Sequence, residues 1–312
     1  MNASKPATAN TVTPPPSPTP AQTQHARLKT ALLTLVALCA FAGNSLLCRA
    51  ALAHGAVDAH SFTWLRLASG AVFLALLISL NRAKAQDNAT DPKPLPWRSA
   101  AALWVYAAAF SMAYIDMGAA TGALVLFGSV QITMTTWGLW RGERFVLQQW
   151  LGYLMAIGGL TWLLLPGASA PPLGSAALMT AAGVAWGAYS ILGKSATRPV
   201  LATASNFRYA VLPATVLLVW ALSSTNAHIS GAGTAYALAS GALASGAGYA
   251  IWYAVLPRLG STTAASLQLS VPIITALAAV LLLNEPLSGT LIVSSAIVLG
   301  GIGLVIGVGK TA

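Results

Sequence analysis

Hydrophobic residues occur along this chain in ten long runs, separated by short stretches rich in polar residues, proline or glycine. Each run is about 20 residues long, the length an α-helix needs to cross the hydrocarbon core of a membrane. The pattern predicts helices over residues 30–52, 60–80, 98–117, 119–140, 147–166, 173–194, 201–222, 233–257, 261–283 and 287–308. We therefore expect an all-α integral membrane protein with ten transmembrane helices.

The first five predicted helices resemble the last five. Arg66 and Arg208 lie early in the second helix of each set, and Gly142-Glu143-Arg144 corresponds in the same register to Asn284-Glu285-Pro286. Because five crossings is an odd number, the second set has to lie in the membrane with the opposite orientation. Two inverted five-helix repeats are characteristic of secondary transporters.

The chain divides into a tail and the two repeats. Residues 1–29 are expected to be a disordered cytoplasmic tail, since they are rich in Pro, Thr, Ser and Ala and lack apolar periodicity. Residues 30–166 form the first repeat and residues 167–310 the second. A cleaved signal peptide is an alternative, because Ala40-Phe41-Ala42 resembles a cleavage site. Against cleavage, the apolar run continues past Ala42 and has an uncut counterpart in the second half.

Composition agrees with a membrane protein. Only 7% of the residues are charged and 56% are hydrophobic, whereas about a quarter of a soluble domain is charged. With the N-terminus in the cytoplasm, most of the sixteen basic residues fall on that side, and loops 167–172 and 223–232 contain neither Lys nor Arg. This asymmetry predicts that both termini are cytoplasmic. The net charge of +10 is thus explained by basic residues on the cytoplasmic side and not by binding to nucleic acid. The expected partners are the lipid bilayer and a small-molecule substrate.

Arg66 and Arg208 lie within predicted membrane helices. An arginine facing lipid costs at least about 2.5 kcal/mol, so such residues usually face a cavity or a partner. A structural or gating role is one interpretation, and extension of the side chain to the nearby membrane interface is another. Contact with a substrate carboxylate is a third.

Polar residues form a stripe on one helix in each half. Thr121, Gly128, Gln131 and Thr135 share a face of the fourth helix, and Gln268, Pro272 and Thr275 share a face of the ninth. Such residues often only hydrogen-bond to neighbouring helices. Two matched stripes favour a central pathway. Pro272 also leaves a backbone carbonyl unpaired one turn earlier.

Aromatic residues add to this pathway at positions away from the helix ends. Trp186 and Tyr189 share a face of the sixth helix, and Tyr249 and Trp252 share a face of the eighth. Rings together with a few amides suit a small amphiphilic or zwitterionic solute.

Acidic residues are rare and peripheral. All six lie in loops or at helix ends, whereas a proton relay normally needs an ionisable group deep in the membrane. The chain also lacks the clustered acids or histidines that an enzyme would use, and no metal-ligand spacing occurs. We expect no enzymatic activity, no cofactor and no metal.

Several motifs resemble EamA-type members of the drug/metabolite transporter superfamily. They are Trp64-Leu65-Arg66-Leu67, the segment from Gly248 to Tyr253, Ser270-Val271-Pro272 and Leu283-Asn284-Glu285-Pro286-Leu287. The resemblance implies a carrier with ten helices in two inverted repeats that exports metabolites, such as amino acids or related compounds, across the bacterial inner membrane. The four-helix multidrug members carry a glutamate in their first helix, and here that helix has Phe41 and Asn44 instead. This difference argues against exchange of cationic drugs for protons.

The resemblance also implies which residues surround a central cavity. With Trp186 added from the aromatic pattern, the candidate substrate-binding residues are Asn44, Tyr114, Gln131, Trp186, Tyr189, Tyr249, Trp252 and Gln268. The candidate structural or gating residues are Arg66, Arg208, Pro272, Glu143 and Glu285. The predicted function is metabolite export by alternating access, by a monomer or a homodimer. The alternatives are a multidrug or toxic-compound exporter and a membrane-embedded enzyme.

Overall fold

A computed structural model describes residues 20–82, 97–165, 170–194, 196, 198–223, 227–259, 264 and 267–307. Regular structure in these residues is helical, apart from one isolated β-bridge between Val57 and Ile229. The helices are α1 (Pro20–Leu52), α2 (Ala59–Arg82), α3 (Trp97–Ala113), α4 (Ala119–Trp140), α5 (Leu147–Leu164), α6 (Leu173–Gly193), α7 (Pro199–Ser223), α8 (Gly231–Leu238), η1 (Ala239–Ala247), α9 (Gly248–Val255), η2 (Leu256–Arg258), α11 (Ser270–Leu283) and α12 (Gly289–Gly307).

α1 begins earlier than the hydrophobic pattern predicted, and the region before α11 contains a turn. α1 begins at Pro20, so residues 20–29 of the expected disordered tail are helical, and residues 1–19 lie outside the described part. Proline suits the first turn of a helix, and the Ala, Gln, Arg, Leu and Lys that follow are good helix formers. α11 begins at Ser270, residues 264, 267 and 268 of the expected span 261–283 are also helical, and residues 261–263, 265 and 266 lie outside the described part. Just before it, Gln268 is helical and Leu269 forms a turn, because Pro272 cannot donate a hydrogen bond to the carbonyl of Gln268.

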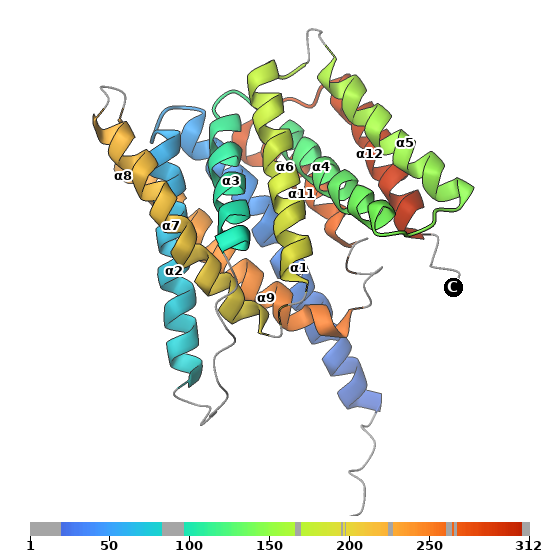
Figure 1. The fold of residues 1–312 in the computed structure, drawn as a ribbon, viewed down its shortest axis with the longest axis horizontal. Helices are drawn as coiled ribbons and strands as arrows, with labels where there is room; N and C mark the ends of the chain where they lie inside the picture. The colour runs from blue at the N-terminus through green and yellow to red at the C-terminus, as the bar shows by residue number, and fades with distance from the viewer. Residues whose placement is uncertain are drawn as a thin grey trace, which may run out of the picture.

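The two halves of the chain pack together through helices that correspond in the sequence repeat. α2 packs on α7 and α5 on α12, while α3 packs on α6 (Figure 1). The α5–α12 contact is close, since a Cβ atom added to Gly152 or to Gly301 would meet the backbone of the other helix. Small residues of this kind let membrane helices approach each other without a polar contact.

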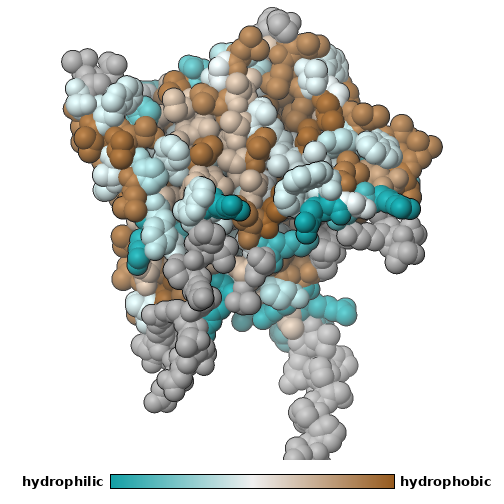
Figure 2. All heavy atoms as spheres, viewed as in Figure 1, coloured by the Kyte–Doolittle hydropathy of each residue, from teal (hydrophilic) through white to brown (hydrophobic). Residues whose placement is uncertain are grey.

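Six helical stretches of the described residues are long and apolar enough to cross a membrane. They are Gln24–Leu52, Ala59–Leu80, Ala119–Trp140, Leu173–Gly193, Pro199–Ser223 and Gly289–Gly307. Large apolar side chains point outward from several of them, and Figure 2 shows apolar residues over much of the visible face. An exposed apolar surface of this extent is typical of a protein surrounded by lipid.

The helical run from Gly231 to Val255 contains a π-helix, η1, between α8 and α9. Gly241 of η1 lies directly against α2, because an added Cβ atom would meet the carbonyl oxygen of Arg66 and the Oγ of Ser69. π-Helical segments inside α-helices frequently occur at functional sites. Here the segment brings the second half of the chain against Arg66.

The bundle has two distinct ends. We call the end where α1 finishes the far end, and the end where α1 begins, at the bottom of Figure 1, the near end. At the far end the α1–α2 connection is hydrogen-bonded to the α7–α8 connection. The backbone N–H of Asp58 donates to the carbonyl of His228 at 2.8 Å, and that of Ser230 donates to the carbonyl of Ala56 at 3.0 Å. These bonds join the two halves at the far end.

Candidate functional site

A cavity of about 30 Å³ lies between the two halves of the bundle. Its lining comes from α1, α3, α4, α6, η1, α9 and the residues just before α11, and it consists of Phe41, Asn44, Ser45, Tyr106, Phe110, Leu126, Phe127, Trp186, Ala244, Tyr249 and Gln268. Sites for small molecules are usually ten times larger or more. The cavity therefore has room for little more than water.

Aromatic rings form most of the cavity wall. The ring of Trp186 lies 4.8 Å from that of Tyr106 and 5.2 Å from that of Tyr249, measured between centroids. Phe41 lies 5.8 Å from Tyr249 on the side of α1. Neighbouring rings at these distances stabilise one another and present flat apolar faces. The wall suits an apolar or aromatic part of a solute.

Hydrogen bonds join α1, α3 and η1 beside the cavity. The Nδ2 of Asn44 donates to the hydroxyl of Tyr106 at 3.1 Å, and the Oγ of Ser240 donates to the Oδ1 of Asn44 at 2.6 Å. Both polar atoms of the Asn44 carboxamide thus have protein partners. Buried polar groups need such partners, and here the three side chains hold the hydroxyl of Tyr106 in place.

Arg66 of α2 is buried against this network, with a side chain only 1% exposed. Its Nη2 donates to the hydroxyl of Tyr106 at 3.0 Å. Its guanidinium carbon lies 5.0 Å from the centroid of the Tyr106 ring and 4.9 Å from that of Phe110. Cation–π contacts of this kind are favourable when the cation is removed from water. The positive charge is consequently held against two rings of the cavity wall.

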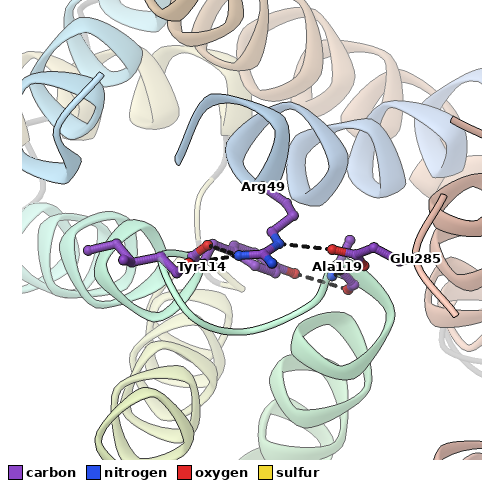
Figure 3. Close-up of polar contacts among 5 residues, drawn as sticks. Arg49, Tyr114, Ala119 and Glu285 are labelled. Carbon is purple, nitrogen blue, oxygen red and sulfur yellow. Dashed lines mark hydrogen bonds and ion pairs between the residues drawn. The ribbon is translucent and has the colours of Figure 1, made fainter. Parts of the chain in front are cut away.

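An ion pair joins the end of α1 to the α11–α12 connection at the far end of the bundle (Figure 3). The Nε of Arg49, in the last turn of α1, lies 2.8 Å from the Oε1 of Glu285 in the α11–α12 connection. Arg49 also donates through Nη1 to the carbonyls of Tyr114 and Ile115, at 3.0 and 2.7 Å. The Oε2 of Glu285 accepts from the backbone N–H of Ala119 at 2.7 Å, at the start of α4. A carboxylate at a helix N-terminus is favourable. We call these contacts the far-end latch.

At the near end, residues of α1 and α11 line an open groove of about 940 Å³. Its lining includes Lys29, Thr34 and Leu38 of α1 and Ser270 and Ile274 of α11. The latch joins the end of α1 to the residues that follow α11, whereas the groove is lined by the same two helices near their other ends, beside the packed residues Leu38 and Val271. The described residues thus have a network of polar contacts at the far end and an open groove at the near end.

Four of the candidate substrate-binding residues line the cavity: Asn44, Trp186, Tyr249 and Gln268. The other four do not. Tyr114 is buried in the α3–α4 turn, Tyr189 is bonded through its hydroxyl to Asn206, Trp252 packs against Phe41, and Gln131 is partly buried on α4. Their part in substrate binding stays a prediction.

The candidate structural or gating residues fall into different environments. Glu285 belongs to the far-end latch, and Glu143 lies beside Gly138 in the exposed α4–α5 turn. Pro272 is in the first turn of α11. Arg66 does not extend to the interface, whereas Arg208 is exposed, with its guanidinium 5.4 Å from the ring centroid of Tyr209. The matched arginines therefore differ in burial.

Sequence reasoning missed Tyr106, Phe110 and Arg49. Tyr106 lies eight residues before Tyr114 on the same segment, so helical periodicity offered a signal for it, since eight residues are close to two turns. Arg49 is one of the sixteen basic residues of the chain. No local pattern indicates its pairing with Glu285, 236 positions away.

The chain is similar to known proteins over most of its length. The model of the EamA-like transporter family matches residues 174–307. The uncharacterized protein PA1977 of Pseudomonas aeruginosa is 54% identical over 278 residues, which cover 89% of this chain and 94% of that protein. A crystal structure whose description states no activity has a similar fold, with a TM-score of 0.63 at 19% identity over 92% of this chain and 100% of that chain. At that level of identity the likeness concerns the fold alone.

Proposed function

Because this chain belongs to the EamA-like transporter family of the drug/metabolite transporter superfamily, we propose that it is an inner-membrane carrier that exports small metabolites, such as amino acids or related compounds. The observation that carries this proposal is the cavity between the two halves, lined by rings and amides from both. Secondary transporters bind their substrates at such an interface between repeats.

The proposed topology has ten spans in two inverted five-helix repeats, with both termini in the cytoplasm. Packing of α2 on α7 and of α5 on α12 supports it, because these pairs are equivalent in the sequence repeat. The basic side chains of Arg141, Lys194 and Arg258 support the orientation, since they follow helices that finish at the near end. In this topology the near end faces the cytoplasm and the far end faces the periplasm.

Alternating access is the proposed mechanism. In this mechanism the far-end latch would hold the periplasmic side closed, and a solute would reach the cavity from the cytoplasmic side, where α1 and α11 line the near-end groove. A solute entering from the cytoplasm would expand the cavity and part the rings. Closure of the near end and release of the latch would then open a path to the periplasm, by rocking of one half against the other.

Untargeted metabolomics of the culture medium tests this function. Strains that overexpress the protein, lack it, or express it with the latch variant Glu285→Gln should be compared. We expect a solute that rises with expression of the wild-type protein and falls on deletion. A medium composition that is the same in all strains would contradict export. Resistance to structurally unrelated toxic compounds without a change in any metabolite would favour the multidrug alternative.

A further inference from the structure

We propose that Tyr106, in the wall of the central cavity, and Arg66, buried beside it and bonded to its hydroxyl, form an anion-recognition site, and that the transported solute carries a carboxylate joined to an apolar or aromatic body. The proposal rests on the transport function proposed above and specifies the class of its substrate.

The first observation is a buried cation without a countercharge. The Nε and Nη1 of Arg66 are buried and have no hydrogen-bond partner among the described residues. The ionisable groups that interact electrostatically with it there are the hydroxyls of Tyr106 and Tyr249 and the thiol of Cys48, and no carboxylate is among them. Buried charges are normally paired, because an unpaired charge in a low-dielectric interior is costly. The positive charge of Arg66 therefore has no negative partner within the described part of the chain.

The second observation concerns the hydroxyl of Tyr106, which lines the cavity. It accepts two hydrogen bonds, one from Arg66 and one from Asn44. A phenolic oxygen that accepts two bonds still has its own hydrogen to donate. The described residues provide no acceptor for that hydrogen, so it is available to a solute in the cavity.

Together the two residues suit an anionic acceptor. A carboxylate oxygen that accepts from Tyr106 would lie within two hydrogen-bond lengths, each about 3 Å, of the Arg66 guanidinium. Hydrogen bonds to a charged acceptor are about twice as strong as neutral ones. The cation would further polarise the hydroxyl through its own bond to it. A neutral or cationic solute would not form this charge-assisted hydrogen bond and should bind more weakly.

The position of Tyr106 is set by groups that the solute does not need. Asn44 uses its Nδ2 on Tyr106 and its Oδ1 on Ser240. Asn44 is therefore a positioning residue for the hydroxyl, although it lines the cavity. Preorganisation of this kind lowers the cost of orienting the donor when a solute binds.

The remaining wall indicates the rest of the solute. Phe41, Phe110, Trp186 and Tyr249 present rings to the cavity, and these favour an apolar or planar body. Gln268 also lines the cavity, and no hydrogen bond joins its carboxamide to another described residue. Its amide can bind a second polar group of the solute, such as an amine.

The other half of the chain provides an internal comparison. Arg208 corresponds to Arg66 in the sequence repeat but is exposed. In the same register, Gly248 stands where Tyr106 stands, so the second half has no hydroxyl at that position. Repeat symmetry alone therefore does not account for the burial of Arg66 beside a tyrosine.

Binding of three matched probes to the purified full-length protein tests the proposal. The probes are 3-phenylpropionate, its neutral analogue 3-phenylpropionamide and the cation 3-phenylpropylammonium, titrated by calorimetry with sodium chloride as a separate inorganic anion. We expect the carboxylate to bind at least about tenfold more tightly than the amide, which corresponds to one charge-assisted hydrogen bond. Arg66→Gln and Tyr106→Phe should both abolish this preference, and the matched control Arg208→Gln should keep it.

Several outcomes would overturn the anion site: equal binding of amide or ammonium, absence of carboxylate binding at millimolar concentration, or a preference that survives both Arg66→Gln and Tyr106→Phe. If chloride displaced 3-phenylpropionate completely, the proposal that the ligand of the site is an organic carboxylate would also be wrong. If Arg66→Gln does not fold, Tyr106→Phe alone tests whether the carboxylate preference depends on this site, because it removes a single oxygen and keeps the ring.

Flux measurements separate this inference from the transport function. Carboxylate binding without flux in proteoliposomes would contradict transport and leave the anion site standing. Flux of neutral or cationic solutes that is unaffected by Arg66→Gln would contradict the anion site and leave transport standing.

Discussion

Arg49 and Glu285 form an ion pair with a separation of 2.8 Å between Nε and Oε1, although they lie 236 positions apart in the chain. The pair ties the end of α1 to the α11–α12 connection, and both partners also bind the α3–α4 turn. Three connections thus meet at one ion pair. In an alternating-access cycle, this contact would have to break each time the far end opens.

Loss of the latch should expose the far end. In a Cys39→Ser background, Cys48 is the remaining cysteine, and it is fully buried one residue before Arg49. We expect Glu285→Gln to increase the labelling rate of Cys48 by a membrane-impermeant maleimide several-fold, because it removes the charge that holds Arg49. The side chains of the pair are about one-fifth exposed, so the effect on stability should be small, about 1 kcal/mol.

Glu143→Gln is the matched control, since Glu143 occupies the equivalent position in the exposed α4–α5 turn. Its labelling rate should equal that of the parent protein. Equal rates for Glu285→Gln and the parent would show that the ion pair does not keep the far end closed.

Close contact between η1 and α2 should not tolerate a side chain at Gly241. An added Cβ atom would meet the carbonyl oxygen of Arg66, so Gly241→Ala should destabilise the protein by about 1–3 kcal/mol through overpacking. The check is the thermal midpoint of the purified protein in detergent. Gly300→Ala serves as control because nothing lies within 4 Å of an added Cβ atom there. A midpoint unchanged by Gly241→Ala would mean that η1 and α2 are not in contact.

The side chains of Ser240 and Asn44 should be energetically coupled, because they share a buried hydrogen bond. Asn44→Ala and Ser240→Ala each break the buried bond between α1 and η1. We expect a double-mutant cycle, followed by thermal unfolding, to give a coupling energy of about 1 kcal/mol, the size usual for hydrogen bonds between membrane helices. Strictly additive effects would contradict the bond. Asn44→Ala should also weaken carboxylate binding, because Tyr106 loses one of its two donors.

Inverted topology predicts that equivalent turns of the two repeats lie on opposite sides of the membrane. Single cysteines introduced by Arg144→Cys, in the α4–α5 turn, and Ser288→Cys, in the α11–α12 connection, can be labelled in intact cells with an impermeant maleimide, with Cys39 and Cys48 replaced. The cysteine at 288 should react from outside and the cysteine at 144 only after lysis. Reaction of both from the same side would contradict the inverted repeats.

Helix ends could be predicted where the sequence contains residues that start or stop a helix. The expected span of residues 119–140 coincides with α4 (Ala119–Trp140), because Gly118 precedes it and Arg141-Gly142 ends it, Gly142 having a φ of +93°. A left-handed residue of this kind stops a helix. Pro172 similarly marks the start of α6. The early start of α1 could not be predicted from hydrophobicity, because residues 20–29 are mostly polar and are helical through residues of good helix propensity.

The candidate site could be predicted only in part, because sequence periodicity identifies a helix face and not its depth in the bundle. Tyr106 and Tyr114 lie about two turns apart, and only Tyr106 lines the cavity while Tyr114 is buried in the far-end turn. Periodicity also treats Arg66 and Arg208 alike. Their different burial depends on what the neighbouring helices place beside them, namely the rings of Tyr106 and Phe110 beside Arg66. That information appears only in the folded chain.

Solute counterflow in proteoliposomes tests the central claim, a carrier that moves a small solute by alternating access, most directly. Liposomes containing the purified protein are loaded with an unlabelled candidate identified by metabolomics, or with 3-phenylpropionate, and diluted into the radiolabelled solute. A carrier predicts transient accumulation of label above its external concentration, abolished in protein-free liposomes and reduced by Tyr106→Phe for a carboxylate solute. Entry of label at the protein-free rate, for every candidate tested, would contradict the account.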